Sequence, residues 1–195
     1  MDWNATWLSI ANTALTRINK QVLQTLDESN TSAMLCNVLI PNCVKNILQQ
    51  NDWHSARKRT LIAPLLKTPA FEYAYQFAMP SDFVRLVKVH SDLPWEQEGE
   101  VILSDEEALA ITYIAYPSTP GSLDPLIVDA ITTLLAAQLS VSLTSDSTIT
   151  NLLYQESEQK LAKAKLAEDA GEPDEKPDLN DWAAFIRGEN RTFGG

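Results

Sequence analysis

The stretch DPLIVDAITTLLAAQLS, residues 124–140, is long and mostly apolar, and it predicts a helix at the centre of the fold. Asp124 can cap this helix, and Pro125 fits its first turn, where a missing backbone N–H costs nothing. Apolar residues then recur at steps of three and four, namely Val128, Ile131, Leu135 and Leu139. We therefore expect a helix over about residues 124–144 that other elements cover.

Two more helices are expected before this one. The first covers about residues 4–19, with Asn4 or Asp2 available as its cap. Its apolar face consists of Trp7, Ile10, Ala14 and Ile18. The second covers about residues 30–50, and Pro41 inside it removes one backbone donor, which predicts a kink or a break.

The fourth expected helix covers about residues 147–170 and is more polar than the others. Glu156 and Lys160 lie four residues apart, the spacing that pairs charges on an exposed helix face. We expect this helix to pack on one side only. The two cysteines, Cys36 and Cys43, lie two helical turns apart in the second helix, beyond disulfide reach, so they are interpreted as buried free thiols.

Short apolar runs rich in β-branched and aromatic residues predict a β module over about residues 57–116. The expected strands cover residues 59–63, 71–80, 83–89, 100–104 and 108–116. In FEYAYQFAMP (71–80) alternate residues are large and apolar, which indicates a strand with one buried face: Phe71, Tyr73, Tyr75, Phe77 and Met79. WEQEGEVILS predicts a hairpin whose turn contains Glu98 and Gly99.

The predicted fold class is α+β, a helical bundle of about four helices with an inserted antiparallel β module and an extended C-terminal arm. The core would cover residues 1–170 and the arm residues 171–195. The run LAEDAGEPDEKPDLND (166–181) holds seven acidic residues and one lysine and cannot bury itself. Apolar residues return after it, which favours a docking motif, with packing onto its own core as the alternative.

The arm supplies the candidate partner-binding residues, because aromatic residues and arginine are the usual anchors of interfaces. They are Trp182, Phe185, Ile186, Arg187, Arg191 and Phe193.

Charge and composition argue against several function classes. The net charge of −11 argues against a broad electrostatic grip on nucleic acid. The local basic run ARKRT (56–60) is expected to point outward and pair with acidic neighbours. No apolar run approaches the length of a membrane span, and the N-terminus has no basic region typical of a secretory signal.

The sequence contains no pattern typical of a catalytic, metal or cofactor site. His54 and His90 have no second ligand at a metal-binding spacing, so both are interpreted as structural or surface residues. The acidic cluster Asp105, Glu106 and Glu107 could provide the two carboxyl groups of a glycosidase, but clustered loop acids are usually solvated surface. The sequence has no glycine-rich phosphate loop.

Several segments together resemble the tail tubular protein A family, the head-to-tail adaptors (gatekeepers) of short-tailed bacteriophages. In chain order the segments are NTALTRIN, LDES, NDWHSARKRTLIA, YAYQFAMPSDFVRLVKV, EGEVILS, YIAYP and DPLIVDAITTLLAAQLS. The most specific part extends from Trp53 to Val89. The resemblance covers about residues 8–165.

This resemblance implies a structural protein without a catalytic site or cofactor, present in the virion tail after assembly in the host cytoplasm. It implies a dodecameric ring between the portal protein and the tail nozzle, with tail fibres or spikes as further candidate partners. DNA would pass through without specific binding, repelled by acidic residues of the channel. In the β module, FEYAYQFAMP would form an aromatic wall, with FVRLVKV returning against it after a turn at Pro80-Ser81-Asp82.

Two other classes of function stay open at this point. A non-viral helical scaffold or chaperone would share the bundle and the acidity but would not need the β module. A virion-associated cell-wall hydrolase would need two carboxyl groups in a cleft, with Asp105 and Glu106 as candidates. Neither class explains the ordered series of matching segments.

Overall fold

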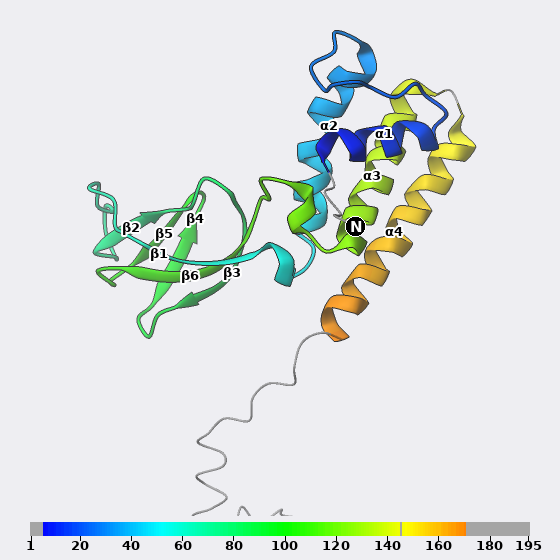
Figure 1. The fold of residues 1–195 in the computed structure, drawn as a ribbon. Helices are drawn as coiled ribbons and strands as arrows, with labels where there is room; N and C mark the ends of the chain where they lie inside the picture. Colours follow the sequence, from blue (N-terminus) through cyan, green and yellow to red (C-terminus); the bar gives the residue numbers. More distant parts are fainter. Residues whose placement is uncertain (1–5, 145, 171–195) are drawn as a thin grey trace, which may run out of the picture.

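The computed structural model describes residues 6–144 and 146–170 as a helical bundle with a β module that projects from one side (Figure 1). This α+β architecture, with four helices and two small antiparallel sheets, confirms the fold class expected from the sequence. The expected arm, residues 171–195, lies outside the described residues.

The helix bounds follow the sequence prediction closely. They are α1 Trp7–Arg17, α2 Thr31–Leu48, α3 Pro125–Leu143 and α4 Ser147–Ala170. Helix α3 is the central element, since it packs against α1, α2 and α4 and buries ten of its residues. In the described part of the chain it is also the one helix long and apolar enough to cross a membrane, so the expectation that no apolar run approaches this length is wrong; a buried core helix passes the same test.

Capping residues set where the helices begin. Asp124 accepts a hydrogen bond from the backbone N–H of Leu126 and caps α3, as expected. The first helix begins later than predicted and is capped by Thr6 instead of Asn4 or Asp2. The Thr6 hydroxyl accepts a hydrogen bond from the Ser9 backbone N–H, and the Ser9 hydroxyl oxygen accepts one from the Thr6 backbone N–H.

A kink or a break was expected at Pro41; helix α2 runs through this residue as one helix, so the predicted break is wrong. Buried residues on both sides of Pro41, namely Ala33, Cys36, Ile40, Cys43 and Ile47, hold both halves of the helix against the core. Proline withholds one backbone donor, the one that would bond the Asn37 carbonyl, and the packing of the helix tolerates this loss.

The β module consists of two three-stranded antiparallel sheets packed face to face. The strands are β1 Arg57–Ile62, β2 Tyr75–Ala78, β3 Phe83–His90, β4 Trp95–Glu98, β5 Val101–Ser104 and β6 Leu109–Ala115. Sheet A has the order β1-β6-β3, and sheet B has the order β2-β5-β4. The side chains between the sheets include Phe77, Val89, Ile102, Leu109 and Ile111.

The hairpin of β4 and β5 is confirmed. Glu98 pairs with Val101, so the loop consists of Gly99 and Glu100, and Gly99 has the positive φ of +57° that the turn requires. Strand β4 was expected only as one side of this hairpin. All four of its residues are exposed.

Strand β6 separates the two cores of the molecule. Its odd-numbered residues, such as Ile111 and Tyr113, face sheet B, whereas Ile114 belongs to the helical core. Trp53 follows α2 and is fully buried where the bundle meets the β module. Its indole N–H donates a hydrogen bond to the Ile47 carbonyl at 3.0 Å. The β module is therefore anchored to the bundle through packed side chains.

The strand expected over residues 71–80 is shorter than predicted. Regular pairing covers only β2, and Phe71, expected on the buried face, is 75% exposed. Glu72 has a φ of 70°, outside the range of an extended strand, so the alternation before Tyr75 belongs to a loop. Strand β3 does not pair with β2 either: the turn after Pro80 carries the chain into the other sheet, and the two strands meet through side chains only.

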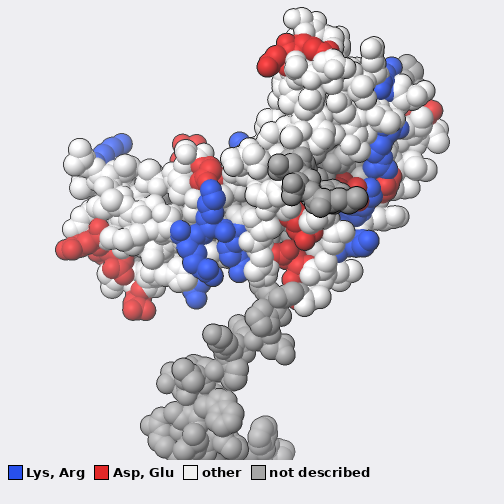
Figure 2. All heavy atoms as spheres, viewed as in Figure 1, with Lys and Arg blue, Asp and Glu red and all other residues white. Residues whose placement is uncertain are grey.

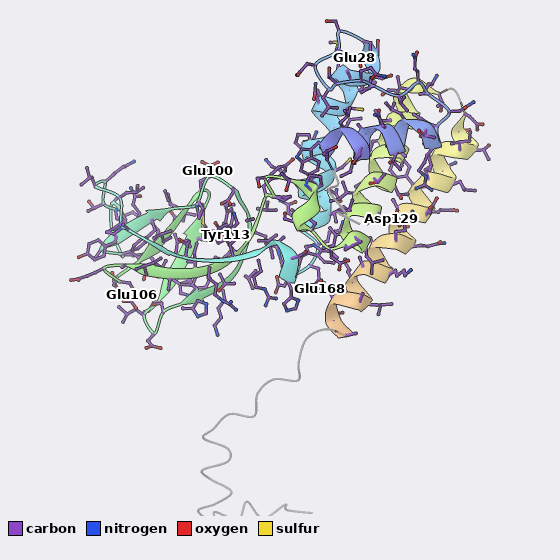
Figure 3. All side chains as sticks on the ribbon, viewed as in Figure 1. Glu28, Glu100, Glu106, Tyr113, Asp129 and Glu168 are labelled. Carbon is purple, nitrogen blue, oxygen red and sulfur yellow. The ribbon has the colours of Figure 1, made fainter. Side chains whose placement is uncertain are left out.

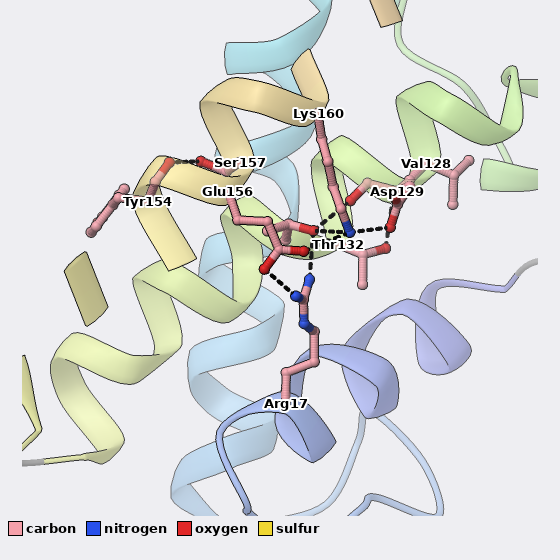
Figure 4. Close-up of polar contacts among 9 residues, drawn as sticks. Arg17, Val128, Asp129, Thr132, Tyr154, Glu156, Ser157 and Lys160 are labelled. Carbon is pink, nitrogen blue, oxygen red and sulfur yellow. Dashed lines mark hydrogen bonds and ion pairs between the residues drawn. The ribbon is translucent and has the colours of Figure 1, made fainter. Parts of the chain in front are cut away.

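Ion pairs connect three of the helices (Figure 4). Arg17 of α1 pairs with Glu156 of α4, and Lys160 of α4 pairs with Asp129 of α3 at 2.8 Å. The predicted pair of Glu156 and Lys160 is present at 3.1 Å. It is part of a network between helices rather than an isolated surface pair.

Candidate functional site

The six arm residues proposed as partner contacts lie outside the described residues. They are Trp182, Phe185, Ile186, Arg187, Arg191 and Phe193.

The two histidines have protein partners in the structure. The Nδ1 atom of His54 lies 2.5 Å from Glu168 Oε1, which joins the start of the β module to the end of α4. The Nε2 atom of His90 lies 2.8 Å from the Thr112 hydroxyl on sheet A. Among residues 6–144 and 146–170, no group of three or more His, Cys, Asp or Glu side chains is placed to hold a metal ion.

Two residues of the acidic cluster after β5, Asp105 and Glu106, form hydrogen bonds with loops at the far end of the β module. Asp105 accepts a hydrogen bond from the Ala74 backbone N–H at 2.8 Å, and Glu106 accepts one from the Ser91 hydroxyl at 3.0 Å. Figure 3 shows Glu106 at the end of the module away from the helices. These contacts give the carboxylates a role in holding loops together.

The two thiols are free and buried, as expected. Burial raises the pKa of Cys36 to about 11 and that of Cys43 to about 12. The Cys43 thiol donates a hydrogen bond to Gln138 Oε1 on α3. Both groups stay protonated and unreactive near neutral pH.

Exposed apolar residues lie on both sides of the bundle. On α2, Met34 and Val38 are four residues apart and 65% and 63% exposed, and we call this pair the α2 flank. On α4, Ile149 and Leu152 are three residues apart and exposed, and we call this pair the α4 flank. Helix α3 lies between the two helices (Figure 1). The bundle thus presents two apolar surfaces that its own core does not cover.

A third apolar surface lies in the loop between β1 and β2, at the end of the β module away from the bundle (Figure 1). Leu66 is fully exposed, and Leu65 and Phe71 are also exposed. We call these three residues the β tip. Clustered exposed apolar side chains mark interaction sites more often than isolated ones do.

A basic surface covers the outer face of sheet A, the face turned away from sheet B. The register aligns Arg57 with Ile114 and Arg85, and Arg59 with Thr112 and Lys88. Opposed residues of antiparallel strands share a face. We call the four cations Arg57, Arg59, Arg85 and Lys88 the basic face, and Figure 2 shows a concentration of Lys and Arg over this part of the β module.

The basic face was not foreseen, because the ARKRT run was expected to pair locally with acids. Lys58 does so, with Asp82 at 2.6 Å. The side chain of Arg59 forms no ion pair or hydrogen bond with another described residue. The alternation of Arg57 and Arg59 was visible in the sequence, but the matching cations on β3 were hidden by two irregularities in that strand.

No protein-family model matches the chain, and no curated protein sequence matches it.

Proposed function

We propose that this chain is the subunit of a ring-shaped head-to-tail adaptor of the tail tubular protein A type in a short-tailed bacteriophage. The ring joins the portal to the tail nozzle in the virion and lets DNA pass. The subunit acts as a structural protein, without a catalytic residue or cofactor.

The proposal rests first on the resemblance of seven segments in chain order. The fold is compatible with it, since a β module projects from a helical bundle as that resemblance implies. The segment with the most specific resemblance, Trp53 to Val89, forms the junction between the two parts and the start of the β module. Trp53 is fully buried there.

The structural observation that supports the proposal, beside this resemblance, is the presence of two different apolar flanks on one bundle. A ring of identical subunits needs two unlike surfaces on each copy, because each copy contacts its two neighbours with different faces. The α2 flank and the α4 flank meet this need on either side of α3. The β tip is not needed for contacts between copies, so it is available to bind a partner protein above or below the ring.

Solution mass tests the proposal. The full chain and a version ending at Gly171 are each measured alone and with the cognate portal protein. We expect the full chain to form a portal-bound ring and the shortened chain to lose the portal, because the arm carries the proposed docking residues. A full chain that stays monomeric with the portal present would contradict the adaptor function and favour a helical scaffold.

A further inference from the structure

The basic face is a positive surface on an acidic protein, and two of its four cations, Arg59 and Lys88, have no side-chain partner among the described residues. Of its four cations, Arg85 pairs with Asp52, and Arg57 donates a hydrogen bond to the Asp52 carbonyl. Arg59 and Lys88 are exposed, and their side chains have no ion pair or hydrogen bond to any other described residue. Asp52 thus contacts both cations on the junction side of this face, Arg57 and Arg85, while Arg59 and Lys88 on the other side carry exposed positive charge.

The end of α4 lies at the junction of the β module with the bundle. Glu168, two residues before the helix ends, accepts a hydrogen bond from the His54 backbone N–H. His54 is only three residues before Arg57, a separation of at most about 11 Å along the chain. Figure 3 shows Glu168 at this junction. The chain therefore continues beyond α4 from a point close to the basic face.

The residues that follow carry the opposite charge. Residues 172–181 contain five acidic residues, Glu172, Asp174, Glu175, Asp178 and Asp181, and one lysine. Ten extended residues span at most about 36 Å. The basic face is smaller than this, because three neighbouring strands span about 10 Å and two residues along a strand about 7 Å.

We propose that the basic face is the docking surface for the acidic segment 172–181 of the same chain. A tethered segment acts at a high effective concentration, so even weak contacts to Arg59 and Lys88 are populated. Exposed charge pairs are individually weak and sensitive to salt, so a partner of the arm can displace them.

Nucleic acid is the less favoured occupant. A net charge of −11 repels a phosphate backbone, and two uncompensated cations release few counterions on binding. The acidic segment suffers no such penalty, because it is already part of the chain.

Zero-length cross-linking of amines to carboxylates tests the proposal on the full-length protein. Lys88 provides the reactive amine, and peptide mass spectrometry identifies the acidic residue joined to it. We expect links from Lys88 to residues 172–181 in the monomer. Arg59→Glu should reduce their yield by about five-fold or more, since exposed ion pairs depend on neighbouring charge, and about 0.5 M salt should do the same.

Lys67→Glu is the matched control, because it changes the net charge equally at an exposed loop position on the same module. It should leave the cross-links unchanged. Arg59→Gln is the second variant and should reduce the yield less than Arg59→Glu does. Circular dichroism of all variants checks that the fold is kept.

Three results would overturn the proposal. If no cross-link joins Lys88 to residues 172–181, the acidic segment does not dock on the basic face. Links confined to cross-linked dimers identify the arm of a second copy as the occupant. Binding of a 20-base-pair duplex that is lost in Arg59→Glu, together with absent cross-links, identifies a nucleic-acid surface. Each result is independent of ring formation and of portal binding.

Discussion

Asp82 shows how one side chain can fix the start of a strand. Its carboxylate accepts hydrogen bonds from Lys58 at 2.6 Å and from the Tyr113 hydroxyl at 2.9 Å. Partial burial favours the protonated acid, but the hydrogen bonds from Lys58 and Tyr113 outweigh it and lower the pKa of Asp82. Burial and the Asp82 carboxylate together raise the pKa of Tyr113 to about 12.

Tyr113 should therefore make stability depend on pH at alkaline values. A pKa raised from 10 to about 12 in the folded state stabilises the fold fully below pH 10, and this contribution is lost as the pH rises toward 12. We expect Tyr113→Phe to lower the free energy of unfolding by about 1 kcal/mol at pH 7 through the lost hydrogen bond.

Absorbance titration at alkaline pH and urea unfolding check this prediction. The variant should lack the tyrosine that ionises near pH 12. Tyr154→Phe, at an exposed position on α4, is the control and should keep both the late titration and the stability. Equal effects of the two substitutions would contradict the role of the Asp82 contact.

At the scale of elements, the hairpin of β4 and β5 depends on Gly99. Its φ of +57° is strained for other residues, and an added Cβ would meet open space. We expect Gly99→Ala to destabilise the protein by about 1 kcal/mol through backbone strain alone. Gly99→Asn should cost less, because asparagine tolerates this conformation.

Gly121→Ala is the control for the hairpin, since Gly121 does not have a positive φ. Urea unfolding compares the three variants. A loss for Gly121→Ala as large as that for Gly99→Ala would show that the turn conformation is not the cause.

The ion-pair network gives the helices a second, acid-sensitive connection. The hydrogen bond from Arg17 is the main cause of the lowered pKa of Glu156, and Lys160 adds to it (Figure 4). A lowered pKa contributes stability above the ordinary value of 4.5, and this is lost as the pH falls through the folded-state pKa. We expect Glu156→Gln to cost about 1 kcal/mol at pH 7 and progressively less in acid.

Urea unfolding between pH 7 and pH 3 measures this dependence. Glu158→Gln removes the same charge from an exposed position on the same helix and should change stability little. A pH dependence shared by both variants would assign the effect to net charge rather than to the network.

At the scale of the whole molecule, the two flanks predict how copies associate. Val38→Glu on the α2 flank and Leu152→Glu on the α4 flank should each leave the fold intact, because both side chains are exposed. Each should prevent ring formation with the portal. In a mixture of the two variants, the intact α4 flank of Val38→Glu can still bind the intact α2 flank of Leu152→Glu. The mixture should therefore form dimers but no ring.

Native mass spectrometry with the portal present checks this outcome. Lys45→Glu, on an exposed part of α2, is the charge control and should still form rings. Rings from either single variant would exclude these flanks as the contact between copies.

The sequence by itself determined the elements whose signals are local. Capped helices with an apolar stripe, such as α3 with Asp124 and Pro125, lay where the pattern predicted. The hairpin at Gly99 followed from its turn chemistry in the same way. These features depend on residues within a few positions of one another, so no distant contact was needed to find them.

Tertiary structure alone decided how the strands are paired. The register of β3 against β6 shifts twice, so Phe83, Leu86 and Val89 face the β core although they are three residues apart. An extra residue at each shift turns the following side chains to the other face. The same shifts place Arg85 and Lys88 on the same face of the sheet as Arg57 and Arg59, across the central strand β6 from them, and therefore the basic face exists only in the folded sheet.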